Sequence, residues 1–135
     1  MPASYLLDTN IVSYLLRNQF QILLSRFETA GAAATAISSI TEGEVFFGIA
    51  KKPGAARLKT AAENFFDVVP VLPWDSAAAR AYGLLRAEQE RKGHPLSTED
   101  LMIAAHALSL SLTLVTHDGA FSFVEELKTE DWTAK

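Results

Sequence analysis

Two aspartates follow short apolar segments that are typical of buried strands. Asp8 comes directly after the segment that ends at Leu7, and Asp118 comes two residues after Thr116. Strands that are joined through helices run parallel, and their ligands bind beyond the carboxyl ends. We therefore expect both aspartates at the same edge of a sheet, where their carboxylates are available for chemistry.

Two further acids lie in apolar helical stretches. Glu44 is four residues after Ile40 and three before Phe47, so it shares a helical face with apolar side chains. This helix is apolar nearly all round and should be largely buried, where an ionised carboxylate is costly unless a positive group meets it. Asp100 lies on the face of Ile103, which predicts that it points toward the core.

Three of these acids also have an ordinary structural explanation. Asp8 is suited to cap a helix, and Asp118 is suited to an Asx turn with Gly119. Asp100 is the third helical position after Ser97, where an acid favours the helix dipole. Taken alone, Asp8 and Asp118 are better explained by these roles than by chemistry.

The four acids gain significance as a group. Clustered carboxylates repel one another and take up protons unless a cation neutralises them. Carboxylate oxygens are the ligands that Mg²⁺ and Mn²⁺ prefer. The sequence therefore predicts a divalent metal site formed by Asp8, Glu44, Asp100 and Asp118. His117 adjoins this site and is a candidate for contact with the substrate.

Alternating strands and helices supply the scaffold, as in mainly parallel α/β domains. Predicted strands cover residues 4–7, 33–37, 68–72 and 113–116, with a short fifth near Leu127. Predicted helices cover residues 9–16, 20–30, 39–50, 55–66, 76–92 and 98–110. Ser39, Asp75 and Ser97 are expected to begin helices and Gly93 to end one, while Pro70 indicates an edge strand.

Composition and charge limit the class of protein. The chain has 135 residues, 49% of them hydrophobic, which predicts one domain over residues 1–135. It has no cysteine, no signal peptide and no apolar run near the ~20 residues of a membrane span, so we expect a cytoplasmic protein.

The net charge of −4 argues at first against a nucleic-acid partner. The charge is uneven, however, because residues 51–92 carry eight bases and five acids. This basic region is either the solvated face of two helices or a surface that contacts phosphates. Charge alone does not decide between the two.

Four segments resemble the motifs of the PIN-domain family, in the right order and with matching spacing. They are Leu6–Asn10, Ile37–Glu44 followed by Gly48, Leu96–Leu108, and Leu114–Asp118 followed by Phe121. The ending from Leu127 to Trp132 is similar to the VapC toxin branch of that family. Each motif is weak alone, but the four together extend over nearly the whole chain and are specific.

The resemblance implies a three-layer α/β/α fold around a central, mainly parallel sheet of four to five strands. It also implies endoribonuclease activity, a homodimer and neutralisation by a VapB-type antitoxin. The metal-binding acids of the family fall on the four acids named above. Thr116 matches a hydroxyl position near the metal, and Asn10 matches a polar residue that supports the site. At His117 the family more often has Asn.

The resulting hypothesis is hydrolysis of RNA phosphodiester bonds by one or two Mg²⁺ or Mn²⁺ ions that the acids hold. Arg17 and the bases of residues 51–92 are expected to guide the RNA backbone. Two alternatives remain. One is a phosphatase with Asp8 as nucleophile, although Asn10 stands where that chemistry needs a second acid. The other is a partner-binding protein whose acids are structural.

Overall fold

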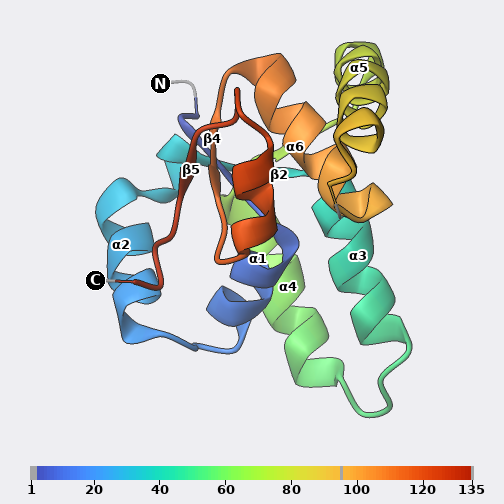
Figure 1. Ribbon diagram of the computed structural model, residues 1–135. Coiled ribbons are helices and arrows are strands. Elements are labelled where there is room, and N and C mark those ends of the chain that lie inside the picture. The colour runs from blue at the N-terminus through green and yellow to red at the C-terminus, as the bar shows by residue number, and fades with distance from the viewer. Residues whose placement is uncertain (1–2, 95, 135) are drawn as a thin grey trace.

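Five short strands form one parallel sheet in the computed structural model, which describes residues 3–94 and 96–134 (Figure 1). The strands are β1 (Tyr5–Leu7), β2 (Thr35–Ser38), β3 (Val71–Leu72), β4 (Thr113–Val115) and β5 (Thr129–Glu130). Their order across the sheet is β3-β2-β1-β4-β5, and all neighbouring pairs are parallel. The predicted parallel α/β class is confirmed, as is the edge position of β3 after Pro70.

Six α-helices connect and cover these strands. They are α1 (Thr9–Leu16), α2 (Gln21–Ala30), α3 (Ser39–Ala50), α4 (Ala56–Val68), α5 (Ser76–Lys92) and α6 (Thr98–Leu110). Short 3₁₀ turns cover Ala32–Ala34 and Gly119–Phe123. None of the helices within residues 3–94 and 96–134 has the length and apolar character that a membrane crossing requires.

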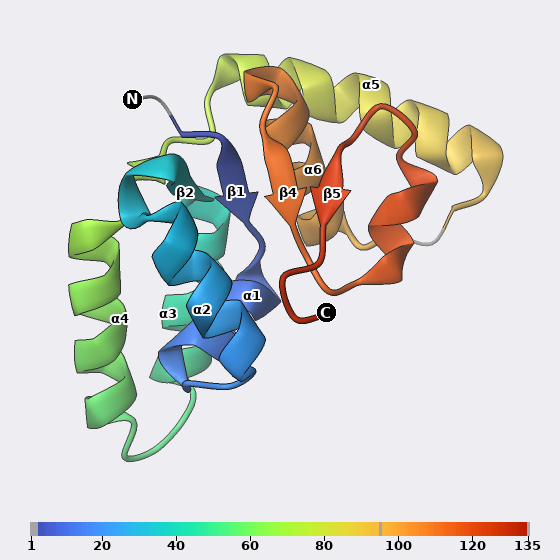
Figure 2. The same cartoon turned by 90° about the vertical axis from the view of Figure 1, so that its left-hand side faces the viewer.

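The sheet separates two apolar clusters. In β1, Leu6 packs in the cluster that includes Leu85 of α5 and Leu101 of α6. The next residue, Leu7, points the other way and packs with Ile11 of α1 and Leu23 of α2. Successive side chains of a strand face opposite sides, so this alternation produces the three layers that were predicted. Figure 2 shows β1, β4 and β5 running side by side in the same direction.

The carboxyl ends of the strands lie at one edge because the sheet is parallel. Leu7 of β1 pairs in register with Val115 of β4. The amide of Asp8 then donates a hydrogen bond to the carbonyl oxygen of Val115 over 3.1 Å. Asp8 and Thr116 therefore leave the sheet from adjacent strand ends.

Local hydrogen bonds confirm two predicted helix starts and one predicted end. The Asp75 carboxylate accepts from the amide of Ala78 at the start of α5, and the Ser97 hydroxyl accepts from the amide of Asp100 at the start of α6. Gly93 ends α5 with a φ of 73°, a left-handed conformation that glycine adopts without steric cost.

Several predicted boundaries are wrong. The cap of α3 is Ser38, whose hydroxyl accepts from the amide of Ile40, whereas Ser39 accepts from the amide of Trp74. The predicted strand 68–72 is shortened because α4 continues to Val68. The predicted strand 33–37 starts later because its first residues belong to the 3₁₀ turn.

The expectation that α3 is largely buried is also wrong. This helix contacts α1 and α4 on one side and α6 on another, which leaves an outer face uncovered. Phe47 on that face is 66% exposed, and the amine of Lys51 lies 4.8 Å from the centre of its ring. Apolar composition therefore did not predict burial here, because α3 lies at the flank of the sheet.

Candidate active site

Asp8 is the most enclosed of the four predicted acids. It is 4% exposed, and one carboxylate oxygen accepts a hydrogen bond of 2.8 Å from the amide of Ile11 at the start of α1. Burial raises the pKa of Asp8 from 3.8 to about 6, and the charges of Asp100 and Asp118 add to that rise. Hydrogen bonds from Thr116 and Ile11 oppose it. Asp8 is thus both a helix cap and a member of a group of carboxylates.

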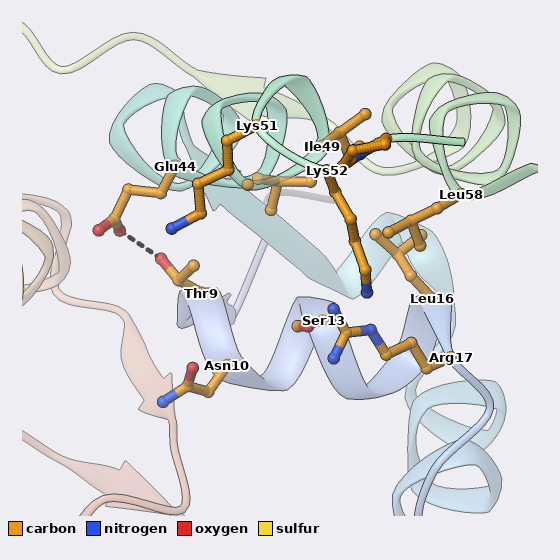
Figure 3. A pocket seen from close by; sticks show the side chains of 13 residues that line it. Thr9, Asn10, Ser13, Leu16, Arg17, Glu44, Ile49, Lys51, Lys52 and Leu58 are labelled. Atoms are coloured by element: carbon orange, nitrogen blue, oxygen red, sulfur yellow. Dashed lines mark hydrogen bonds between the residues drawn. The ribbon is translucent and has the colours of Figure 1, made fainter. Parts of the chain in front are cut away.

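Glu44 projects from α3 toward the start of α1. The hydroxyl of Thr9 donates a hydrogen bond of 2.6 Å to its Oε1 atom (Figure 3). Burial raises the pKa of Glu44, and the charges of Glu99 and Asp100 contribute to the rise. The Thr9 hydroxyl also lies 3.2 Å from that of Thr41. Glu44 is therefore held by a hydroxyl of the helix that Asp8 caps.

Asp100 lies in the first turn of α6 and is half-buried. Burial raises its pKa, and the neighbouring charges of Asp118 and Glu99 contribute. The charge of Asp118 raises the pKa of Asp100, and the charge of Asp100 raises the pKa of both Asp8 and Glu44. These effects connect all four predicted acids in one electrostatic group.

Asp118 follows β4 and is exposed. Its carboxylate accepts a hydrogen bond of 2.9 Å from the amide of Ala120, which is the Asx turn considered from the sequence. Its own amide donates to the hydroxyl of Thr116 over 3.0 Å. The buried Thr116 side chain also lowers the pKa of Asp8, so it lies close to both strand-end aspartates.

The other three predicted site residues lie in different surroundings. Asn10 is exposed and lines a cavity with Glu44. Arg17 lines the same cavity at a distance from the acids (Figure 3). The ring of His117 turns toward the C-terminal segment, where its Nδ1 atom lies 3.0 Å from both Asp131 Oδ2 and Thr133 Oγ1. In this arrangement His117 is engaged by its own chain.

Two residues near the acids were not identified from the sequence. Thr9 bonds Glu44, and its position directly after Asp8 at the start of a helix was the available signal. Glu99 adds a fifth negative charge that both Glu44 and Asp100 sense. The sequence did not indicate this role, because the helix dipole alone makes an acid common in the first turn of a helix.

The cavity beside the acids has a volume of about 510 Å³ and lies between α1 and α3. Thr9, Asn10 and Glu44 line one end, and Arg17 and Lys52 line the other (Figure 3). Among the four acids it is Glu44 that lines this cavity, which is large enough for part of a polar ligand.

The donor chemistry of the site suits a hard divalent cation. Its acids offer oxygen atoms only. Burial raises the pKa of Asp8, Glu44 and Asp100, the charges of neighbouring carboxylates add to the rise, and a cation would relieve both effects. As the side chains stand, no group of three or more His, Cys, Asp or Glu residues within 3–94 and 96–134 is arranged to hold a metal ion. Coordination of one ion by these acids therefore requires their side chains to move closer together.

The sequence is similar to known proteins over nearly its full length. The profile of the PIN domain family matches residues 5–127. The chain is 37% identical to the tRNA(fMet)-specific endonuclease VapC of Shigella flexneri over 130 residues, which is 96% of this chain and 98% of the relative. It is 35% identical to ribonuclease VapC2 of Haemophilus influenzae over 129 residues, 95% of this chain and 97% of the relative.

Solved structures show the same fold. The chain superposes on the DNA-bound VapBC of Salmonella typhimurium with a TM-score of 0.91 and 34% identity, covering 98% of this chain and 99% of the other. For VapBC2 of Rickettsia felis bound to a promoter DNA fragment, the TM-score is 0.86 and the identity 30%, with 93% and 96% covered.

Proposed function

The chain belongs to the PIN-domain family and within it to the VapC ribonucleases, and from this premise we propose a metal-dependent endoribonuclease that acts as the toxin of a toxin–antitoxin pair. The observation that carries the proposal is the electrostatic group formed by Asp8, Glu44, Asp100 and Asp118. Keeping four carboxylates together is unfavourable in the free protein, so the arrangement is explained by a cation that they bind.

Mg²⁺ or Mn²⁺ held by these acids supplies Lewis-acid polarisation of a phosphoryl oxygen and a lowered pKa of a bound water. The protein supplies fixed ligands. Ile11 and Thr116 hold the Asp8 carboxylate, and Thr9 holds Glu44. These hydrogen bonds limit how far Asp8 and Glu44 must move when the acids close around the ion. The negative charges of the four acids repel a phosphate group unless a cation neutralises them. Binding of the substrate therefore depends on the cation.

The relatives suggest substrate and partner. The Shigella flexneri relative is named for the initiator tRNA, tRNA(fMet), and two solved relatives are VapBC complexes. We therefore propose RNA as substrate, with initiator tRNA as the first candidate, and a VapB-type antitoxin as partner. We also propose that residues 1–135 form one domain, because β1 and β5 belong to the same sheet.

The proposal is tested by incubating total cellular RNA and purified initiator tRNA with the antitoxin-free chain. Reactions contain Mg²⁺, Mn²⁺ or EDTA, beside the Asp8→Asn variant. We expect discrete fragments that require both the metal and Asp8. Intact RNA in every reaction, from protein shown to be folded, would instead favour a partner-binding protein with structural acids.

A further inference from the structure

The cavity between α1 and α3 has a basic end that the acids do not explain. Arg17 follows α1, and Lys52 follows α3 by two residues. Figure 3 shows the guanidinium of Arg17 and the amine of Lys52 pointing toward one another across the cavity, near Ser13. Two cations that converge in this way repel each other unless an anion lies between them.

These two cations have no anionic partner among the residues described. The ion pairs within 3–94 and 96–134 include those of Arg86, Arg91 and Lys92, which bond glutamates on or near α5. Neither Arg17 nor Lys52 makes a side-chain hydrogen bond or an ion pair with any described residue, although both side chains line the cavity. Arg86, Arg91 and Lys92 of α5 are thus paired with glutamates, whereas Arg17 and Lys52 of the cavity have no such partner among the described residues.

The basic lining continues beyond the first cavity. A second cavity of about 340 Å³ shares Leu16, Arg17, Lys52 and Leu58 with the first and adds Arg57. Leu16 and Leu58 give the shared stretch an apolar wall between the cations. Together the two cavities form one groove that leads from Glu44, past Arg17 and Lys52, to Arg57; we call it the basic groove.

Helix dipoles explain only part of this pattern. Arg17 and Lys51 stand at the C-terminal ends of α1 and α3, where cations are favoured in any protein. Arg57 is the second residue of α4, and a cation is unfavourable at that end of a helix. The dipoles also give no reason for Arg17 and Lys52 to converge on one space. A ligand with repeated negative charges accounts for all of these positions.

We propose that the basic groove binds the sugar-phosphate backbone of single-stranded RNA, with Arg17 and Lys52 holding a phosphate at the end of the cavity away from the acids. The inference rests on the proposed ribonuclease function and assigns a binding site to it. A groove that combines spaced cations with apolar walls suits single-stranded nucleic acid, which offers a phosphate and an apolar base face at every nucleotide. The groove is continuous with Glu44, one of the four acids. The rest of the RNA backbone therefore lies on the side of α1 and α3.

The test uses the full chain with Arg17→Gln and Lys52→Gln combined. The matched control combines Arg86→Gln and Arg91→Gln, which removes the same charge from the ion-paired face of α5. Both pairs are exposed, and thermal unfolding checks that each variant is folded. Cleavage of initiator tRNA is measured, together with binding of a fluorescent twelve-nucleotide poly(U) in an Asp8→Asn background at several salt concentrations.

For the groove variant we expect KM to rise about 10-fold or more with little change in kcat, since phosphate contacts act mainly on binding. The slope of log Kd against log salt should fall by about 1, as expected for the loss of a phosphate contact. The control should stay within about 2-fold of the parent chain in both measurements.

Three results would overturn the inference. The first is an equal loss in the two variants, which would indicate net charge alone. The second is an unchanged KM and salt slope in the groove variant. The third is unchanged RNA binding with a weakened complex with an acidic antitoxin segment, which would make the groove a peptide site. The poly(U) measurement needs no turnover, so failure of RNA cleavage in the parent chain is a separate result that counts against the proposed function.

Discussion

The two ends of the cavity between α1 and α3 hold their charged groups in different ways. At the acidic end, Glu44 is fixed by a hydrogen bond from Thr9, and the preceding residue Asp8 is fixed by one from the amide of Ile11. At the basic end, Arg17 and Lys52 are exposed and make no such bonds to the described residues. Groups that take part in chemistry benefit from being preorganised, whereas groups that bind a flexible backbone can adapt when it arrives. We therefore expect substitutions at the acidic end to lower catalysis and substitutions at the basic end to weaken RNA binding.

The largest effect is expected when one of the four acids loses its charge. Asp100→Asn should lower single-turnover RNA cleavage by about 100-fold or more, the scale of losing one preorganised electrostatic group. Glu99→Gln removes the same charge from the same helix. Because Glu99 is exposed, this substitution should lower RNA cleavage by less than about 10-fold. Equal losses in the two variants would mean that the local net charge, rather than individual ligands, controls cleavage.

The second prediction concerns the free energy of unfolding of the metal-free protein. The pKa of Asp8 in the folded protein is about 6, above the ordinary 3.8, so its contribution to stability is full below about pH 4 and lost as the pH rises to 6. That rise corresponds to about 3 kcal/mol. In EDTA at pH 7.5, Asp8→Asn should therefore be more stable than the parent chain by up to about 3 kcal/mol, because Asn still caps α1.

Urea unfolding of both chains between pH 4 and pH 8 measures this difference. The gain of Asp8→Asn should shrink as the pH approaches 4. A variant that is less stable than the parent at pH 7.5 would show that Asp8 acts mainly as a structural cap.

A smaller effect is expected at the hydroxyl that fixes Glu44. Thr9→Val keeps the shape of the side chain but removes the 2.6 Å hydrogen bond to Oε1. We expect kcat/KM to fall about 10- to 100-fold, the usual cost of losing a group that orients a metal ligand. Thr9→Ser restores the hydroxyl and should recover most of the activity. If Thr9→Ser is as impaired as Thr9→Val, the methyl group and not the hydrogen bond is what matters.

The smallest effect is expected at His117, which lies next to the acids in sequence but contacts the C-terminal segment. Its ring is turned to Asp131 and Thr133, so His117→Ala should leave RNA cleavage within about 3-fold of the parent chain. The contact with Asp131 is partly exposed, and its loss should cost less than about 1 kcal/mol of stability in thermal unfolding. A large loss of cleavage would instead assign His117 to the substrate, as the sequence suggested.

The sequence predicted the framework of the fold because the signals for it are local. Asp75, Gly93 and Ser97 mark helix ends through their own hydrogen bonds and backbone conformation, and the structure confirms all three. The wrong boundaries lie where tertiary contacts decide. Ser38 and Ser39 are equally suited to cap α3, and only the bond from Trp74 to Ser39 distinguishes their roles.

The candidate site was predictable in part for the same reason. Parallel strands bring Asp8 and Asp118 to one edge, which is a rule of topology and needs no side-chain detail. The contact between Thr9 and Glu44 joins residues 35 positions apart, so no local sequence pattern predicts it. The convergence of Arg17 and Lys52 likewise depends on how α1 and α3 lie against each other.

The place of β1 in the sheet has a consequence for biosynthesis. β1 leaves the ribosome before the other four strands of the sheet, yet it lies in the middle of the sheet and pairs with β4, more than one hundred residues later. Pairings between distant segments form late, because a long loop must close before they contribute stability. A nascent chain that has not yet reached Thr116 can neither enclose Asp8 nor bring it beside Asp118. Chains that end before Thr116 therefore lack the arrangement of Asp8 and Asp118 on which the proposed cleavage depends.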